Sequence, residues 1–379
     1  MIGIHFILRF VIITLFVISC KRSSEDIEKI NIETVKTVSF DLITEIGQND
    51  KTNFGHLRDL VLLSERNLLV SDWDKLTIEQ FSEDGEKIGT IAEQGRGPGE
   101  LSVFFLLFDG GNDTLIVRHR GMTQQLDFFG ISDNGVYKYA RSFIKSMPDE
   151  RHVSIIGAIS DSEYLATASW RIQGFQSAVS KYSEENYLPV VIINKSEEIV
   201  EDSLHMIKTV NPLIKFEKES MLVVGMPPFQ YRDRIRILED GRYIIVRPDS
   251  SSLYLYDSKH VIINKIKLNI KERIPTKRNL EYALKDFPSE YHNDLKVRVP
   301  TVKPPFLNIW FSSKYMLLYS DINEYGKEMI VLTMDAMPVG KFYISEYDEV
   351  RYFRDHRIYA LHKNPEVGHS VRIYEVDIE

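Results

Sequence analysis

Basic and aromatic side chains recur at the ends of short apolar runs along this 379-residue chain. Guanidinium and imidazole groups donate charge-assisted hydrogen bonds to carboxylate or sulfate groups, and an indole ring offers a flat apolar face to a sugar or an aromatic ligand. The candidate ligand-binding residues are Asp72, Trp73, Arg118, His119, Arg120, Trp170, Arg171, Arg247, Asp321 and His362. The same side chains could instead pair with Asp or Glu of a neighbouring segment or pack between segments, and the sequence leaves that choice open.

A glycine-rich loop is the second candidate, formed by Gly95, Arg96, Gly97, Pro98, Gly99 and Glu100. Its glycines permit positive φ, and successive backbone N–H groups in such a turn can surround an anion. The loop lacks the Gly-Lys-Ser/Thr signature and the strand–loop–helix context of a phosphate-binding loop. The sequence therefore favours a structural role, in which the glycines shape a connection between two repeated units.

Catalytic and metal-binding signatures are weak. The chain contains no H-E-x-x-H, G-x-S-x-G or Walker sequence and no pair of cysteines. His119 or His362 could act as a general acid or base, with an arginine holding a substrate carboxylate. Asp72, Asp74, Asp321 and Glu324 could offer oxygen ligands to Ca²⁺, but Asp is also an ordinary turn residue. We expect no metal and no cofactor, and we assign no catalytic residue.

The N-terminus has the pattern of an export signal. Residues 1–19 are almost entirely apolar, and the run from 10 to 18 is too short to span a bilayer of about 30 Å. Val17-Ile18-Ser19-Cys20 resembles the lipobox of bacterial lipoproteins, in which the signal is cleaved before an acylated cysteine. Cys20 is the only cysteine, so no internal disulfide is possible. We expect a signal peptide at 1–19 and a lipidated tether at 20–35, the alternative being an uncleaved anchor helix.

The composition is that of a globular protein, with 43% hydrophobic and 27% charged residues. The net charge of −8 and the lack of a long basic block argue against nucleic acid as a partner. Aromatic residues make up 11% of the chain, which favours strands.

Four short apolar runs separated by turn residues form a unit that is repeated six times, first over residues 56–93. The sixth unit ends one strand short at the C-terminus, and a matching strand stands before the first unit, at 37–43. Closing the ring with this strand removes exposed sheet edges. The sequence therefore predicts an all-β fold over 36–379, a six-bladed β-propeller of four-stranded blades whose N-terminal strand closes the last blade. A pair of β-sandwiches or an open solenoid would not explain the displaced strand.

In this architecture the candidate residues stand at the ends of the second strands, on the same face as the connections between blades. Longer connections are expected near 172–187, 210–230 and 271–305. The last contains a predicted helix at 278–287, ended by Pro288. Its start is basic, with Lys271, Arg273, Lys277 and Arg278. We interpret it as a lid over an anionic ligand or, alternatively, as a solvated surface loop.

The lipobox, the repeat and the segment Glu93-Gln94-Gly95-Arg96-Gly97-Pro98-Gly99-Glu100-Leu101 together resemble the six-bladed propeller lipoproteins of Bacteroidota, which are related in shape to NHL and TolB-like propellers. The resemblance implies a lipid-anchored protein of the cell envelope, at the periplasmic or surface face of the outer membrane, and it carries over no catalytic residue. We expect a non-catalytic protein that binds a glycan, a peptide or an envelope protein at the propeller mouth. The alternative is an envelope lyase or hydrolase acting on an acidic saccharide.

Overall fold

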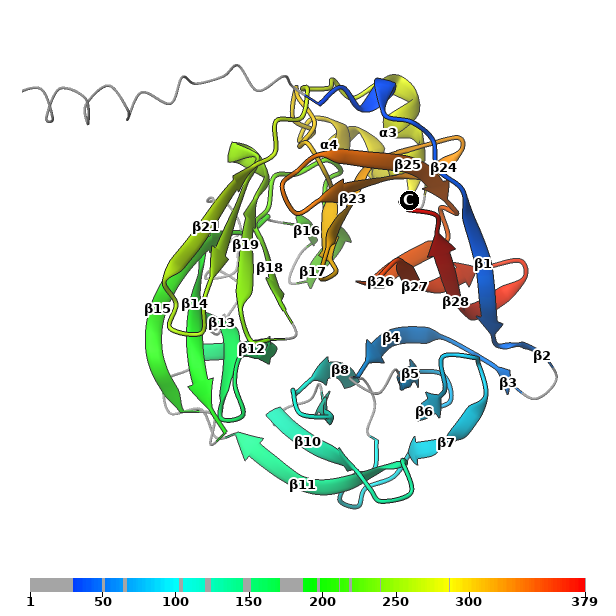
Figure 1. Cartoon of the computed structure of the whole chain (residues 1–379), viewed down its shortest axis with the longest axis vertical. Helices are drawn as coiled ribbons and strands as arrows, with labels where there is room; N and C mark the ends of the chain where they lie inside the picture. Colours follow the sequence, from blue (N-terminus) through cyan, green and yellow to red (C-terminus); the bar gives the residue numbers. More distant parts are fainter. Residues whose placement is uncertain are drawn as a thin grey trace, which may run out of the picture.

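Six four-stranded antiparallel sheets stand around a common axis in the computed structural model (Figure 1). The structure describes residues 30–49, 52–63, 67–101, 105–119, 124–145, 151–170, 187–195, 198–210, 212–217, 220–238, 240–285 and 287–378. The expected signal peptide at 1–19 and Cys20 lie outside these residues. The arrangement confirms the expected six-bladed β-propeller.

The first three blades follow one another in chain order, each built from four consecutive strands. Blade 1 consists of β4 (Leu57–Leu62), β5 (Leu68–Asp72), β6 (Thr77–Phe81) and β7 (Lys87–Ala92). Blade 2 consists of β8 (Phe105–Asp109), β9 (Thr114–His119), β10 (Gln124–Ile131) and β11 (Tyr137–Lys145). Blade 3 consists of β12 (Arg151–Ala158), β13 (Glu163–Trp170), β14 (Tyr187–Asn194) and β15 (Ile199–Lys208).

The remaining blades complete the ring. Blade 4 consists of β18 (Arg234–Ile237), β19 (Tyr243–Arg247), β20 (Ser252–Tyr256) and β21 (Ile262–Lys267). Blade 5 consists of β22 (Asn308–Phe311), β23 (Tyr315–Asn323), β24 (Gly326–Thr333) and β25 (Pro338–Ile344). Blade 6 takes β26 (Asp348–Arg354), β27 (Arg357–Asn364) and β28 (Gly368–Val376) from the C-terminus and β1 (Phe40–Ile46) from the N-terminus.

The closing strand pairs as expected. β1 is antiparallel to β28, with Phe40 opposite Val376 and Ile46 opposite Val371, and Figure 1 shows the two strands side by side. The strand begins at Phe40, three residues later than the sequence predicts. The reason is that Thr37 forms a bridge to Lys341 of blade 5 and Val38 donates its backbone N–H to the same residue, so these two residues pair with the neighbouring blade. The N-terminal segment therefore contacts two blades before it closes the ring.

The hydrophobic core lies between neighbouring blades. Strands with both faces covered read as continuous apolar runs, and every residue of β5 is buried. One cluster joins blade 1 to blade 6 through Leu68, Phe81, Tyr359 and Val371, each at most 1% exposed. Comparable clusters join the other pairs of neighbours, so each blade is held by the burial of side chains on both of its faces.

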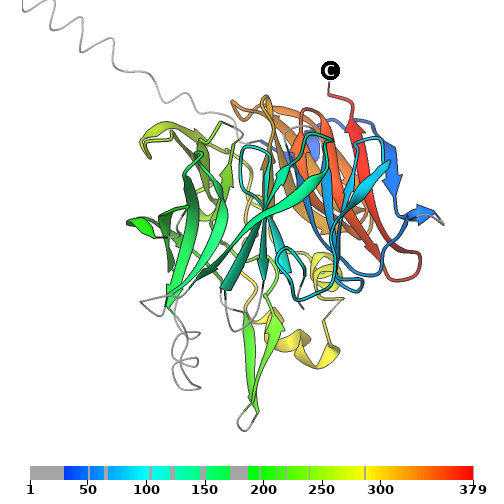
Figure 2. The ribbon, with the colours of Figure 1, turned by 90° about the horizontal axis from the view of Figure 1, so that it is seen from below.

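The face that carries the connections between blades is called here the mouth face. A hairpin of β16 (Leu213–Glu217) and β17 (Ser220–Gly225) precedes blade 4, and the helices α3 (Lys277–Leu284) and α4 (His292–Lys296) precede blade 5. Figure 2 shows the hairpin and the helices projecting from the same side of the ring. Insertions at 210–230 and 271–305 therefore rise over one face, as the spacing of the repeats predicts.

The helix α3 starts with a capping box, in which Thr276 and Asn279 each accept a hydrogen bond from the other's backbone N–H. It ends at Leu284, three residues earlier than the predicted end at 287. Pro288 is the N-cap of the next element, the short 3₁₀ turn η3 (Ser289–Tyr291), so the residues just before it connect two elements and do not continue the helix. Leu284 packs with Leu213 of the hairpin and Leu295 of α4. This small cluster ties the two insertions together.

The smaller elements are η1 (Ile32–Thr34), η2 (Pro248–Ser250) and the strand pair β2 (Gln48–Asn49) and β3 (Thr52–Asn53). Ile32, near the end of the expected tether, is only 2% exposed and packs into the core between blades 4 and 5. Among the described residues no helix is both long enough and apolar enough to cross a membrane.

Candidate functional site

Asp72, at the end of β5, is fully buried and serves the local backbone. Its carboxylate accepts hydrogen bonds from the backbone N–H groups of Gly55 at 2.7 Å, His56 at 3.0 Å, Asp74 at 3.1 Å and Lys75 at 3.3 Å. Four backbone donors around one carboxylate fix the turn that follows β5 and the segment that enters blade 1. The carboxylate of Asp72 therefore stabilises the backbone of the mouth face and does not point toward a ligand.

Trp73 lies between blades 1 and 2. Its indole N–H donates to the carbonyl of Phe105, the first residue of β8, at 2.9 Å. The ring of His56 is stacked on it with centroids 6.1 Å apart, and the guanidinium of Arg58 lies over it at 4.9 Å. Trp73 therefore packs between blades, which is one of the two roles that the sequence left open for it.

Arg118 and His119, at the end of β9, are each 6% exposed. His119 Nε2 lies 2.9 Å from a carboxylate oxygen of Asp127, and Arg118 donates to the hydroxyl of Ser154 in blade 3 at 2.8 Å. Burial alone would raise the pKa of Asp127, but hydrogen bonds from His119 and neighbouring side chains outweigh it and lower the pKa. The pair keeps a buried carboxylate charged next to an imidazole.

A second histidine–aspartate pair stands at the end of β27. His362 is 3% exposed, and its Nδ1 lies 2.6 Å from Oδ1 of Asp348. The hydroxyl of Tyr374 donates to the other oxygen of Asp348 at 2.7 Å. Burial, with the charge of Asp348, raises the pKa of Tyr374, so the phenol stays protonated and keeps donating.

The segment 271–305 is attached to blade 5 by ion pairs. The carboxylate of Asp321, which is 6% exposed, forms an ion pair with the buried ammonium of Lys303. The same carboxylate lies 3.6 Å from the guanidinium of Arg273. Arg273 also pairs with Glu328 at 2.9 Å, and Arg278 of α3 pairs with Glu324 at 2.6 Å. Basic residues that the sequence offered to an anionic ligand thus meet carboxylates of the same protein.

Arg247, at the end of β19, keeps 40% of its side chain exposed. It lies 3.9 Å from Asp233 and over the ring of Tyr254 at 5.5 Å. Arg120 and Arg171 lie outside the described residues. Trp170 is the last residue of β13. Among the described basic candidates at the strand ends, Arg118, His119, Arg247 and His362, Arg247 is therefore the one that is not buried.

In the glycine-rich loop, the side chain of Glu100 folds back onto the loop's own backbone. The N–H of Gly97 donates to Oε2 of Glu100 at 2.6 Å, and a Cβ added at Gly95 would lie 1.9 Å from the same oxygen. Gly99 has φ of 77°, and a side chain there would collide with Tyr139 of blade 2. The anion beside these backbone donors is the carboxylate of Glu100, and Arg96 and Pro98 belong to the same turn between blades 1 and 2.

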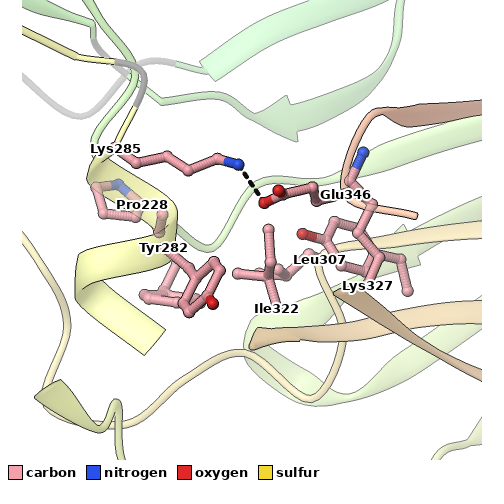
Figure 3. Close-up of a pocket in the computed structure, with 10 residues that line it drawn as sticks. Pro228, Tyr282, Lys285, Leu307, Ile322, Lys327 and Glu346 are labelled. Atoms are coloured by element: carbon pink, nitrogen blue, oxygen red, sulfur yellow. Dashed lines mark hydrogen bonds and ion pairs between the residues drawn. The ribbon is translucent and has the colours of Figure 1, made fainter. Parts of the chain in front are cut away.

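A cavity of about 270 Å³ opens on the mouth face between α3, blade 5 and the connections that lead into blades 4 and 6 (Figure 3). Its walls mix apolar and aromatic side chains with charged ones, and they are formed by Pro228, Phe229, Tyr282, Ala283, Lys285, Leu307, Tyr319, Ile322, Lys327 and Glu346. Figure 3 shows Lys285 of α3 reaching toward Glu346, with which it forms an ion pair. We call this cavity the α3 pocket.

Two polar groups in the α3 pocket are electrostatically unusual. Lys327 donates to the backbone carbonyl of Asp348 at 2.6 Å, and burial lowers the pKa of its ammonium. Burial also raises the pKa of Tyr319, with a smaller contribution from Asp321. Perturbed groups gathered in a cavity are typical of ligand sites. The sequence did not single out the residues that line the α3 pocket, because they come from three connections between blades and from the two strands β23 and β24, whose convergence has no sequence signature.

The described residues contain no group of three or more His, Cys, Asp or Glu side chains placed to hold a metal ion. Asp72 and Asp321, which the sequence offered as oxygen ligands, are occupied by backbone N–H groups and by Lys303.

No family model matches the chain, and no curated protein matches it in sequence. Similar solved structures include a Bacteroides fragilis protein whose name describes it as exported, with 14% identity, a TM-score of 0.49 and coverage of 93% of this chain and 98% of that one. A Bacteroides vulgatus member of the DUF4221 family is 11% identical, with a TM-score of 0.47 and coverage of 91% and 100%. Virginiamycin B lyase from Staphylococcus aureus is 9% identical, with a TM-score of 0.42 and coverage of 88% and 99%. At these values the similarity assigns no activity to this chain.

Proposed function

We propose that this chain is a lipid-anchored envelope protein that binds a glycan, a peptide or a protein partner at the mouth of its propeller without catalysing a reaction. The lipobox at residues 17–20 supports the anchor. A diacylated cysteine holds a protein stably at a membrane, because each buried CH₂ contributes about 0.8 kcal/mol. The protein then presents a rigid ring with insertions on one face.

The burial of the two candidate histidines supports binding rather than catalysis. A general acid or base must lie within hydrogen-bond reach of its substrate. His119 and His362 are 6% and 3% exposed, and each contacts a buried aspartate. These pairs stabilise the ends of their blades and present no imidazole to a ligand in this conformation.

The α3 pocket is the observation that carries the proposal. Its volume of about 270 Å³ is close to the lower end of the usual range for ligand sites, ~300–1,000 Å³. It therefore suits one sugar ring or one side chain of a larger ligand. Tyr282 and Phe229 offer aromatic faces, and the pair of Lys285 with Glu346 offers a donor and an acceptor at its edge.

Filling the α3 pocket tests this proposal. Glycan and peptide libraries are screened against the protein by thermal shift, and the affinity of each hit is measured by calorimetry. The substitution Ala283→Trp places an indole in the pocket, and we expect it to weaken binding at least tenfold. Glu281→Trp adds the same ring on α3 at a side chain that is 60% exposed, and it should leave binding unchanged.

Two results would contradict the proposal. Equal affinity of both tryptophan variants would remove the α3 pocket as the site. Turnover of an acidic saccharide that is lost in His119→Ala would favour the lyase or hydrolase alternative over a binding protein.

A further inference from the structure

Three arginines stand at alternate positions where the chain enters blade 4: Arg232, Arg234 and Arg236. Arg234 and Arg236 belong to β18, the innermost strand of the blade, which borders the middle of the ring in Figure 1. Alternate side chains of a strand project to the same side. Ile235, between them, is 6% exposed and packs in the core between blades 3 and 4. Arg234 and Arg236 therefore face the opposite side, toward blade 5, and Arg232 lies close enough to both for its charge to lower their pKa values.

Two of these arginines also have a structural role. Arg236 donates to the carbonyl of Ile309 at 3.0 Å and to the side-chain oxygen of Asn308 at 2.8 Å. Arg234 donates to the carbonyl of Leu307 at 3.0 Å. These acceptors lie on or just before β22, the innermost strand of blade 5, whose inner edge has no partner strand. A guanidinium has five N–H donors, so Arg234 keeps four of them for other acceptors.

Arg232 has no such role. Among the described residues it makes no hydrogen bond and no ion pair, although most of its surface is enclosed. Burial lowers its pKa. Asp233, the nearest carboxylate in sequence, turns the other way and accepts the N–H of Lys208 at 3.0 Å. None of its nitrogen atoms is both shut off from solvent and without a partner, so its N–H groups can reach a dissolved anion, which would offset the cost of burying most of the charged side chain.

The three arginines are close enough for their positive charges to repel one another. Burial and repulsion from Arg232 and Arg236 lower the pKa of Arg234, and burial and repulsion from Arg232 lower that of Arg236. Within the described part of the chain no carboxylate forms an ion pair with any of the three. The inner side of blade 4 thus holds a concentrated positive charge without a counterion.

Blade 6 also has arginines on its innermost strand, but one of them is paired with carboxylates. Arg351 and Arg354 of β26 donate to carbonyls of Arg58 and Leu63 at the inner strand of blade 1. Arg351, however, is paired with Glu349 at 2.9 Å and lies 3.7 Å from Asp59. An arginine can therefore donate to the inner strand of the neighbouring blade and also be paired with a carboxylate. Such contacts between blades do not explain why Arg232 has no carboxylate partner.

We propose that Arg232, Arg234 and Arg236 bind a polyvalent oxyanion of the phosphate type at the axis of the ring. Planar guanidinium groups match the geometry of phosphate oxygens and bind them through pairs of N–H donors. Alternate residues of a strand are about 6.6–6.8 Å apart, so one phosphate or diphosphate group contacts two guanidinium groups. Arg232 lies nearest the mouth face and receives the anion first. This site shares no residue with the α3 pocket and does not depend on the function proposed for it.

Calorimetry on the full chain in detergent tests the site with inorganic phosphate, pyrophosphate and glycerol phosphate, at constant ionic strength. Acetate is the monovalent comparison. We expect at least one phosphate compound to bind at least tenfold more tightly than acetate. Preference for the inorganic anions would assign free phosphate as the source, and preference for the ester would assign a phosphorylated organic ligand. Absence of binding by all three phosphate compounds would overturn the proposal.

The variant Arg232→Ala separates anion binding from the structural role of the arginines. Because Arg232 bonds to no described residue, we expect unchanged thermal stability and at least tenfold weaker phosphate binding. Arg242→Ala removes the same charge from an exposed turn at the other end of β18 and should bind as the unchanged protein does. If Arg232→Ala fails to fold, Arg232→Gln replaces it. Unchanged affinity in the Arg232 variant, or equal weakening in the Arg242 variant, would overturn the proposal.

Discussion

Buried carboxylates on the mouth face hold the chain in place. Asp72 collects backbone N–H groups, while Asp127 and Asp348 each contact a buried histidine. A buried carboxylate is stable only when its oxygens are hydrogen-bonded, and each of these has several donors. The blades therefore end in polar clusters that are internally satisfied. Ligand-binding groups must then come from other residues, such as those of the α3 pocket.

Replacing Asp72 should destabilise the whole domain. Hydrogen bonds to a charged group contribute about 1.5–3 kcal/mol each, and Asp72→Ala leaves four backbone N–H groups without their acceptor. We expect the free energy of unfolding to fall by about 3 kcal/mol or more in denaturant titration. Asp74→Ala, at the exposed residue two positions on, is the control and should change it by less than about 0.5 kcal/mol. A similar loss in both variants would contradict the role given to Asp72.

His205 predicts a decrease in stability in mild acid. Its Nε2 lies 2.8 Å from the hydroxyl of Tyr243, and burial, with the nearby His260 and Arg247, lowers its pKa from 6.5 to about 4. Because the folded protein binds this proton less readily than the unfolded chain, stability is complete above pH 6.5 and falls as the pH drops toward 4. Melting temperatures measured from pH 7 to 4.5 should fall less in His205→Gln than in the unchanged protein. Parallel curves would exclude His205 as the cause.

Residue types alone could not distinguish a ligand contact from an internal one. The sequence correctly placed Asp72, His119 and His362 at strand ends, but their partners lie on other strands of the same blade or on adjacent segments. Arg232 shows the reverse case. Its position before β18 was visible in the alternating Arg-Asp-Arg-Ile-Arg pattern, but the lack of a carboxylate opposite it depends on how blades 4 and 5 face each other.

Strands and connections were the most predictable elements. Apolar runs of regular length between turn residues located all four strands of blade 1. The unusual length of the connection at 271–305, together with its helical pattern of apolar residues, located the helix α3. The α3 helix follows from a local signal, since its capping box and its following proline act within a few residues. The hairpin β16–β17 was expected only as an insertion, because its two short strands lack the pattern of a blade.

Removing the closing strand should destabilise the ring more than removing any loop. Phe40 of β1 packs against Phe342 with ring centroids 4.9 Å apart and against Tyr374 at 5.6 Å. Deletion of residues 36–43 removes these contacts and exposes the edge of β28, so we expect the melting temperature to fall by more than about 10 °C. A chain that starts at residue 30 keeps β1 and should melt normally. An unchanged melting temperature after the deletion would contradict closure through β1.

At the scale of the whole molecule, the propeller fold can be predicted from the sequence, but the position of the α3 pocket cannot. The strand displaced to the N-terminus requires closure, and closure requires equivalent blades, so the fold follows from the repeat. The α3 pocket instead joins Phe229, Tyr282, Tyr319 and Glu346, which are separated by many residues and meet only because two insertions, blade 5 and the connection from blade 5 to blade 6 share one face. Aromatic and charged residues of this kind occur throughout the chain and give no signal before the fold is known.

Attachment of the whole molecule to a membrane depends, in the proposed function, on a single atom, the Sγ of Cys20. Replacement by alanine removes the only thiol in the chain, so Cys20→Ala should move the protein from the membrane to the soluble fraction. Two acyl chains supply enough buried CH₂ groups, at about 0.8 kcal/mol each, to account for stable attachment without a spanning helix. Fractionation followed by carbonate extraction measures the change. Ser19→Ala, which leaves the thiol in place, should remain attached and serves as the control. A Cys20→Ala protein that still sediments with membranes and resists carbonate would show that the apolar segment 1–19 itself is the anchor, which is the uncleaved-helix alternative.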